Sequence, residues 1–167
     1  ENGAIVASAW LASKLTSFSM ETITLYLPII LPSLTGILVL LIGHLLGFSA
    51  MGLVAGLITV SSNIFLVRTR AGYFDTDLLT LIIPLVLIYL LLRVIKTNNF
   101  KNALVASLLL TTQTFFYNNA PLLSEVIIIT FIVFTALLRR DNLSHLGSIL
   151  ILLPAMVSFD LPTSIRI

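Results

Sequence analysis

Two aspartates stand one residue apart in the segment RTRAGYFDTDLL, in a chain with few charged residues. They are Asp75 and Asp77, and Thr76 lies between them. Their carboxylates can approach one point, and hard divalent cations such as Mg²⁺ or Mn²⁺ take such oxygen ligands. The pair equally suits a helix start, where Asp77 would cap the first turn and its charge would meet the positive end of the helix dipole. The spacing therefore predicts either a metal site or a helix start.

Arg68 opens the same segment, at the end of an apolar run. A guanidinium can hold a phosphate or a carboxylate with two parallel hydrogen bonds. An arginine at the end of a membrane helix is also a common interfacial anchor, and Arg70 suits that role better. Arg68 is thus a candidate ligand for an anionic group, with anchoring as its alternative.

The composition is that of a membrane protein, so membrane lipid is the first expected partner. Hydrophobic residues make up 58% of the 167 residues and charged residues 10%, whereas an ordinary soluble domain has about 25% charged residues. The mean hydropathy is +1.12. A net charge of +2 without a basic run argues against nucleic acid. The absence of cysteine excludes disulfides and thiolate metal sites.

Six apolar runs predict about six membrane helices, because lipid offers no partner for open backbone groups. The runs are Met20 to Gly43, Ser49 to Val67, Leu78 to Leu92, Ala103 to Phe116, Pro121 to Leu138 and Leu143 to Phe159. A crossing helix needs about 20 residues and tolerates about 17, so the third and fourth runs cross only if flanking aromatic residues reach the interface.

A short helix at the membrane surface is expected from Ala4 to Leu15, with a plain lead-in to the next helix as its alternative. Pro28 and Pro32 are expected to kink the first span. We predict an all-α, polytopic transmembrane helical bundle over residues 1–167, with about six membrane helices, a short N-terminal surface helix and no soluble domain.

The distribution of lysine and arginine predicts the orientation of the chain. When the connections are assigned alternately to the two sides, one side receives Arg93, Lys96, Lys101, Arg139 and Arg140, and the other receives Lys14, Arg68, Arg70 and Arg166. On the first side the charges cluster in two short connections, as the positive-inside rule expects of the cytoplasm. The acidic segment is therefore predicted to face away from the cytoplasm, and His44 and His145 to lie on the opposite side from it.

The segment RTRAGYFDTDLL resembles the second acidic motif of the oligosaccharyltransferase catalytic subunit, most closely its bacterial, PglB-like form. Upstream, SFSMETITLYLPIILPSL is similar to the family's entry into its second transmembrane helix. Downstream, the short basic connections and TFFYN fall where the family has comparable features. The resemblance covers nearly the whole chain and implies a partial GT-C-like glycosyltransferase membrane domain.

The resemblance implies roles for three residues. Asp75 corresponds to the family aspartate that ligates a catalytic divalent metal, Mg²⁺ or Mn²⁺. Asp77 corresponds to its partner in the motif, and Arg68 to an arginine beside the active centre. The implied activity is transfer of an oligosaccharide from a polyprenyl pyrophosphate to asparagine in an N-x-S/T sequon of an acceptor polypeptide. The implied location is the outer, periplasmic or extracellular face of the bacterial inner membrane.

The chain also departs from the family pattern. FFYNNAPLL replaces the usual tryptophan-tryptophan-tyrosine-proline-serine run, which puts substrate contacts from that loop in doubt. The family's first acidic motif, its glutamate-bearing external loop and its WWDYG motif are absent from these 167 residues. We therefore expect an N-terminal portion of a longer enzyme that is inactive alone.

Three other functions fit the same residues. A glycosyltransferase of similar architecture would use a polyprenyl monophosphate sugar and transfer it to lipid or sugar. A small transporter subunit would bind a cation through Asp75 and Asp77. A purely structural subunit would tolerate replacement of both aspartates.

Overall fold

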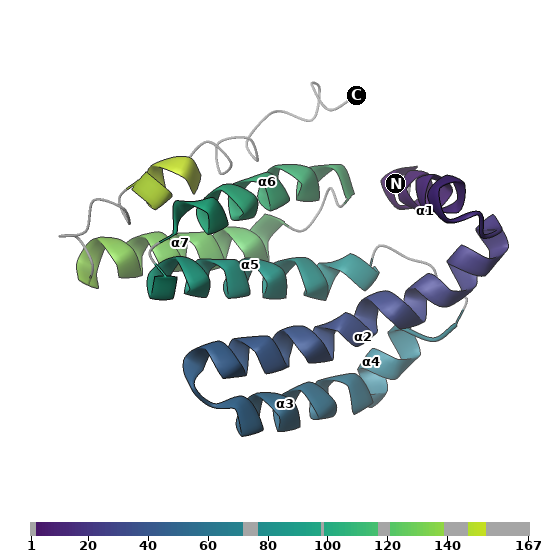
Figure 1. Cartoon of the computed structure of the whole chain (residues 1–167), viewed down its shortest axis with the longest axis horizontal. Coiled ribbons are helices and arrows are strands. Elements are labelled where there is room, and N and C mark those ends of the chain that lie inside the picture. The colour runs from purple at the N-terminus through teal and green to yellow at the C-terminus, as the bar shows by residue number, and fades with distance from the viewer. Residues whose placement is uncertain (1–2, 72–76, 98, 117–120, 139–146, 153–167) are drawn as a thin grey trace. The chain divides into compact units, whose positions relative to one another are not determined.

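A computed structural model of the chain describes residues 3–71, 77–97, 99–116, 121–138 and 147–152. The elements are all helices: α1 (Gly3–Thr16), α2 (Met20–Leu46), α3 (Ser49–Ser61), α4 (Asn63–Arg68), α5 (Asp77–Thr97), α6 (Phe100–Phe116) and α7 (Pro121–Leu138). A further helical stretch covers residues 147–152 (Figure 1). These ranges contain no strand, so the all-α prediction is confirmed for them.

The chain forms two compact units, residues 1–86 and 87–167, and α5 passes from the first into the second. The first unit holds α1 to α4 and the beginning of α5. The second holds the rest of α5 together with α6, α7 and the stretch 147–152.

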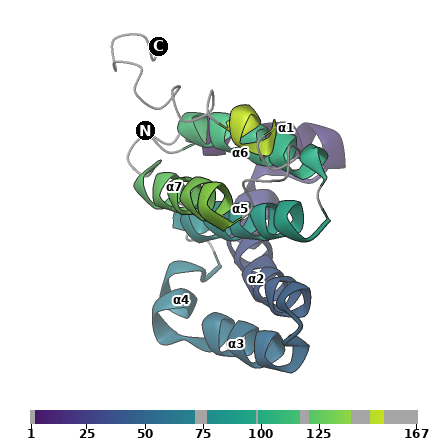
Figure 2. The same cartoon turned by 90° about the vertical axis from the view of Figure 1, so that its left-hand side faces the viewer.

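In the first unit, α2 and α3 form an antiparallel hairpin in which glycines of the two helices lie against each other (Figures 1 and 2). A Cβ atom added to Gly43 would lie 2.5 Å from the Cα atom of Gly52, and one added to Gly56 would lie 2.6 Å from the carbonyl oxygen of Gly36. Without side chains at these positions the two backbones approach closely, as small residues allow in membrane helix pairs. The glycines therefore set the register of the hairpin.

The turn of the hairpin is a Schellman motif. Gly47 has a φ of 90°, in the left-handed region that glycine enters without strain. Its backbone N–H donates to the carbonyl of His44 (3.1 Å), and the N–H of Phe48 donates to the carbonyl of Gly43 (2.8 Å). These bonds satisfy carbonyls that the end of α2 leaves open, so α3 can begin two residues after Gly47.

The second predicted span is not one helix. Ser62 is extended, with φ −66° and ψ 139°, and separates α3 from α4. Its hydroxyl accepts from the N–H of Phe65 at 3.4 Å, as an N-cap does. The 13 residues of α3 rise about 20 Å, which is less than the hydrocarbon thickness of about 30 Å. The prediction of a continuous span over Ser49 to Val67 was wrong because the serine competes for backbone hydrogen bonds.

The other helices differ from the predicted runs mainly at their ends. The segment expected to form a short surface helix is helical, as α1, and its place at a membrane surface stays a prediction. The first span extends to Leu46 and passes through Pro28 and Pro32, both fully buried. The third predicted span corresponds to α5, which extends to Thr97 and has 21 residues. Only 147–152 of the sixth run lies inside the described residues.

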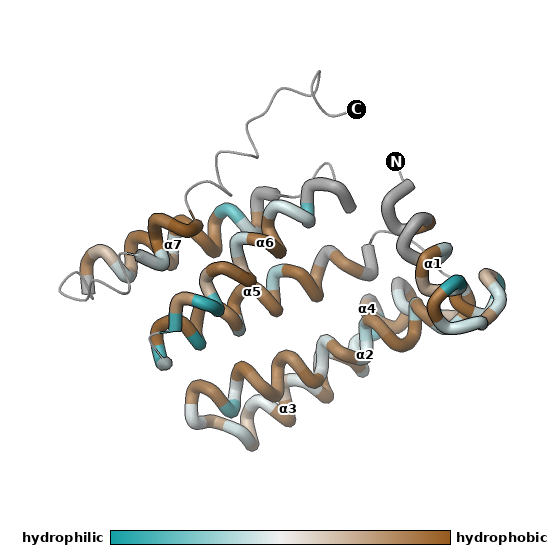
Figure 3. The backbone as a smooth tube through the Cα atoms, turned by 45° about the horizontal axis from the view of Figure 1, so that its top comes forward, coloured by the Kyte–Doolittle hydropathy of each residue, from teal (hydrophilic) through white to brown (hydrophobic). Residues whose placement is uncertain are grey.

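Small side chains are buried and large apolar ones are exposed in the first unit. Gly52 and Gly56 are buried, whereas Met51 and Ile58 on the same helix are more than 65% exposed. The tube in Figure 3 is apolar along most of α2. A soluble helix hairpin would bury its large apolar residues, so this distribution suits a surface that faces lipid.

Among the described helices, α2 alone is long and apolar enough to cross a membrane. Two shorter apolar helices, Ser49–Ser61 and Leu123–Leu137, accompany it. The bundle of about six membrane helices is not confirmed by these ranges and stays a prediction.

The second unit has an apolar core. Leu110, Ile128 and Leu152 are completely buried in it, from α6, α7 and the stretch 147–152. Ser124 of α7 and Gln113 of α6 join the two helices through a buried hydrogen bond of 2.9 Å between Oγ and Oε1. Interhelical hydrogen bonding is therefore a structural role of Gln113.

Candidate active-site connection between α4 and α5

The three predicted site residues lie at the ends of one connection and within it. Arg68 is the last residue of α4, and Asp77 is the first residue of α5. Asp75 lies outside the described residues, and the side chains of Arg68 and Asp77 are not described. The backbone thus brings both ends of the motif to helix ends, while the metal-ligand role of the aspartates stays a prediction.

The start of α5 at Asp77 agrees with the helix-start prediction for this residue. In the first helical turn a carboxylate interacts favourably with the partial positive charge of open backbone N–H groups, worth about 0.3–1 kcal/mol at an exposed site. This role is compatible with ligation, because a carboxylate has two oxygens and several acceptor positions.

The end of α4 is held by a local hydrogen bond. The hydroxyl of Thr69 donates to the carbonyl of Phe65 at 2.8 Å. This side-chain bond is made to a carbonyl of the last helical turn. Arg70, which follows, is exposed, in keeping with its expected role as an interfacial anchor rather than a ligand.

His44 lies far from this connection along the hairpin. Its Nδ1 is 2.9 Å from the hydroxyl of Ser49, so it takes part in the turn between α2 and α3. From Ser49, α3 rises about 20 Å before the break at Ser62, and α4 then leads to Arg68. His44 and Arg68 therefore lie at opposite ends of the hairpin, as expected for a histidine that does not serve the acidic segment.

The described residues hold no cluster of three or more histidine, cysteine, aspartate or glutamate side chains that could bind a metal ion. A metal site built from three such side chains would have to include residues outside the described ranges. Two carboxylates leave positions for substrate oxygens or water, as Mg²⁺ sites commonly do.

Two buried hydroxyls in the described helices have no hydrogen-bond partner, those of Thr35 in α2 and Thr135 in α7. Other threonines of the chain donate to a carbonyl one turn earlier, for example Thr59 to Ala55 at 2.8 Å. Neither Thr35 nor Thr135 lies in the connection, so we assign them no part in the chemistry.

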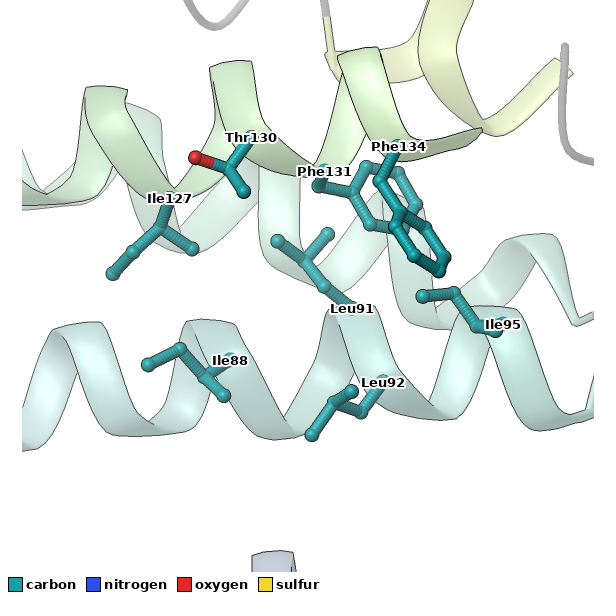
Figure 4. Close-up of a pocket in the computed structure, with 8 residues that line it drawn as sticks. All are labelled: Ile88, Leu91, Leu92, Ile95, Ile127, Thr130, Phe131 and Phe134. Atoms are coloured by element: carbon teal, nitrogen blue, oxygen red, sulfur yellow. The ribbon is translucent and has the colours of Figure 1, made fainter. Parts of the chain in front are cut away.

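An open apolar groove of about 230 Å³ lies between α5 and α7 in the second unit (Figure 4). Its lining comprises Ile88, Leu91, Leu92, Ile95, Ile127, Thr130, Phe131 and Phe134. Thr130 supplies the one hydroxyl in this lining, and no ionisable side chain belongs to it. The groove therefore offers no acid, base or metal ligand.

The sequence matches the family described as oligosaccharyl transferase STT3, N-terminal, over residues 4–165. That range contains the whole connection from Arg68 to Asp77. This chain belongs to the STT3 oligosaccharyl transferase family. The charged segment between two apolar helices is thus part of the STT3 N-terminal region.

Two curated relatives support the assignment. The chain is 30% identical over 138 residues to the undecaprenyl-diphosphooligosaccharide–protein glycotransferase of Campylobacter jejuni subsp. jejuni serotype O:2. The same values hold for the protein of that name from Campylobacter jejuni strain RM1221. The match covers 82% of this chain and 19% of each relative. The chain therefore spans about a fifth of the length of these relatives.

Sequence reasoning missed the glycine contact of the α2–α3 hairpin. The available signal was the spacing of Gly52 and Gly56, a G-x-x-x-G pattern in an apolar helix. Such a pattern marks a close helix contact in membranes. Gly36 and Gly43, seven residues apart on the preceding helix, supply the partner surface.

Proposed function

We propose that the chain is the N-terminal membrane portion of a metal-dependent oligosaccharyltransferase. The full-length enzyme transfers a glycan from a polyprenyl pyrophosphate to the side-chain nitrogen of asparagine in an N-x-S/T sequon. The observation that carries the proposal is the family match over residues 4–165, which includes the acidic motif. The name of the Campylobacter relatives, which specifies an undecaprenyl-diphosphooligosaccharide and a protein, supports the choice of donor and acceptor.

The proposed chemistry assigns a role to each of the three candidate site residues. The acceptor nitrogen forms a bond to the anomeric carbon, and the bond from that carbon to the pyrophosphate oxygen breaks with its electron pair staying on the oxygen. The amide proton is released to water. A divalent cation, when bound, supplies Lewis acidity to the leaving pyrophosphate. Asp75 and Asp77 hold it with hard oxygen ligands, which is the donor set that Mg²⁺ and Mn²⁺ prefer.

The remaining groups orient the substrates. A carboxylate oxygen of the pair that is not used by the cation accepts hydrogen bonds from the acceptor amide, which aligns its nitrogen. Arg68 binds an oxygen of the pyrophosphate through its guanidinium. Because α4 ends at Arg68 and α5 begins at Asp77, two helix ends position these groups.

The proposed location is the periplasmic face of the bacterial inner membrane. It rests on the distribution of lysine and arginine, which is denser in the two short connections assigned to the cytoplasm. It also rests on α2, which can cross a membrane. A glycan donor on a polyprenyl pyrophosphate presents its pyrophosphate at the membrane surface, which is where this orientation places the connection.

Replacement of Asp75 in the full-length enzyme tests the function. We expect Asp75→Ala to reduce glycosylation of an acceptor peptide by orders of magnitude at unchanged expression, because one carboxylate ligand is lost. Chelation should abolish wild-type activity, and added Mg²⁺ or Mn²⁺ should restore it. Wild-type turnover of Asp75→Ala would contradict the proposal.

Glu21 provides a matched control, because it is an exposed carboxylate in the first turn of α2. Glu21→Ala removes an acidic side chain at a helix start, and we expect activity close to wild type. Transfer to lipid or sugar in place of the peptide would instead identify a glycosyltransferase that uses a polyprenyl monophosphate sugar.

A further inference from the structure

Both sides of the α2–α3 hairpin are interrupted. Pro28 and Pro32 lie inside α2, and neither has an N–H group that could donate to a carbonyl of the preceding turn. On the other side, Ser62 is extended and separates α3 from α4. Prolines and breaks of the helical ladder are the usual causes of helix bending, so each side of the hairpin has a point at which it can bend.

The glycine contact shows that the two interruptions lie at the same level. A Cβ atom added to Gly36 would lie 3.0 Å from a side-chain carbon of Val60. Pro32 precedes Gly36 by four residues, which is about 6 Å along the helix axis. Ser62 follows Val60 by two residues, which is about 3 Å. In an antiparallel hairpin both steps run in the same direction, so Pro32 and Ser62 face each other across the hairpin.

The interruptions cost backbone hydrogen bonds that continuous helices would make. Each proline leaves one carbonyl of α2 without its usual helical donor, and the first N–H groups of α4 have no acceptor within that helix. Ser62 offsets this in part, because its hydroxyl donates to the carbonyl of Thr59 at 3.0 Å. Hinges are commonly a few residues at the ends of elements that absorb changes of backbone angle, and Ser62 is such a residue.

The hairpin packs differently on the two sides of this level. We call residues 36–46 of α2 together with α3 the stem, and residues 20–31 of α2 together with α4 the arm. The stem is held by close backbone contact at Gly52 and Gly56. In the arm, α4 contacts mainly α3 and touches α2 little (Figure 2). Parts of a protein with few packed contacts move at a lower cost in free energy.

The arm also receives the preceding helix. The chain changes direction at Ser17, whose φ is 60°, and α1 packs against α2 at a steep angle (Figures 1 and 2). Both ends of the arm therefore continue into other parts of the chain, α1 on one side and the connection to α5 on the other.

We propose that Pro28, Pro32 and Ser62 form a hinge across the hairpin and are positioning residues for Arg68. Arg68 ends α4, so the arm carries its backbone while the glycine contact keeps the stem fixed. Bending of the hinge moves Arg68 toward or away from the pyrophosphate of the donor. The role of Arg68 rests on the proposed function, whereas the bending of the hairpin does not.

Distances between nitroxide labels measure the hinge in the full-length enzyme in nanodiscs. In a cysteine-free background, labels at Leu46 and Val67 span the hinge, and labels at Leu46 and Ile58 lie within the stem. All three side chains are more than half exposed. In double electron–electron resonance we expect a broader distance distribution for the pair 46–67 than for the pair 46–58. A distribution for 46–67 as narrow as that of the stem pair would overturn the hinge.

Ser62→Ala removes the break on one side of the hairpin. Alanine favours a continuous helix and lacks the hydroxyl that caps α4, and Ser62 is exposed, so the substitution leaves no cavity. We expect the 46–67 distribution to narrow while the 46–58 distance stays the same. Ser61→Ala is the matched control, because Ser61 is also exposed and is the last residue of α3. Unchanged breadth in Ser62→Ala would contradict the hinge.

The proline side of the hinge has its own label pair. Labels at Leu25 and Leu46 lie on α2 on the two sides of both prolines. We expect the double variant Pro28→Ala and Pro32→Ala to narrow the 25–46 distribution, because two N–H groups are restored to the helix. Equal breadth in the wild type and in this variant would exclude the prolines from the hinge.

Kinetics test the effect of the hinge on Arg68. We expect Ser62→Ala to raise the KM for the polyprenyl pyrophosphate donor several-fold and to leave the KM for the acceptor peptide unchanged. Ser62→Thr, which keeps a capping hydroxyl, should behave as the wild type. Equal changes in both KM values, or wild-type kinetics in Ser62→Ala, would reject the positioning role. The label distances need no turnover, so a failure of the hinge and a failure of the function tested by Asp75→Ala are distinguishable.

Discussion

Asp77 has two candidate roles at one position, because it is the first residue of α5 and also a proposed metal ligand. Asp77 is the first residue of α5, and a carboxylate in a first helical turn favours the helix through the dipole by about 0.3–1 kcal/mol. As a metal ligand it would contribute far more to the reaction, because a lost ligand removes transition-state stabilisation that nothing else supplies. The two roles therefore predict different outcomes for the same substitution.

Asp77→Ser separates these roles in the full-length enzyme. Serine is a favourable residue at helix starts, so we expect thermal stability to change by no more than about 1 kcal/mol. Activity should fall strongly, because a neutral hydroxyl is a poor replacement for a carboxylate ligand. The measurement is glycosylation rate beside thermal unfolding. An active Asp77→Ser enzyme would reduce Asp77 to a helix-start residue.

At the level of the elements, the α2–α3 hairpin depends on glycines, which have no side chain to keep the two helices apart. Gly43 and Gly52 allow the backbones to touch, and the Schellman turn at Gly47 fixes where the chain reverses. The cost is conformational, because glycine inside a helix is unfavourable by about 0.5–1 kcal/mol relative to alanine. Close packing along the hairpin offsets this cost.

Gly56→Ala tests the glycine contact. The added Cβ would lie 2.6 Å from the carbonyl oxygen of Gly36, and a backbone atom cannot move away without shifting a helix. We expect a loss of about 1–3 kcal/mol of stability, measured by thermal unfolding in detergent. Gly147→Ala is the control, since its Cβ would meet nothing within 4 Å. Equal stability of both variants would contradict the contact.

Helix periodicity and length could predict part of these elements. The starts of the first and fifth runs, at Met20 and Pro121, agree with α2 and α7, because apolar runs between polar breaks mark helices that lipid or a core must cover. The break at Ser62 was missed, because serine inside an apolar run is often tolerated and only the local backbone decides whether it caps a new helix.

At the scale of the whole molecule, the chain of this STT3-family protein divides into two helical units. The family match covers residues 4–165, and the chain spans 19% of its Campylobacter relatives. The proposed membrane orientation places the connection between α4 and α5 outside and the end of α5 inside. Orientation is therefore the property of the whole that most directly tests the proposal.

Cysteine labelling tests this orientation. Arg70 and Thr97 are both exposed, one after α4 and the other at the end of α5. In a cysteine-free full-length enzyme, Arg70→Cys should react with an impermeant maleimide in right-side-out vesicles, and Thr97→Cys should react in inverted vesicles. Full labelling of both in detergent is the control. The reverse pattern would reject the periplasmic location.

The sequence by itself determined helicity, the apolar surface, the start of a helix near the second aspartate and the family. These properties follow from local composition and from the order of the motifs, both of which can be read from the sequence without knowledge of contacts between distant segments. Only the tertiary structure decided that glycines pair across the α2–α3 hairpin, that Ser62 divides a span and that α1 turns across α2. Those features depend on contacts between distant segments or on backbone angles that several neighbouring residues select together, so no single stretch of sequence specifies them.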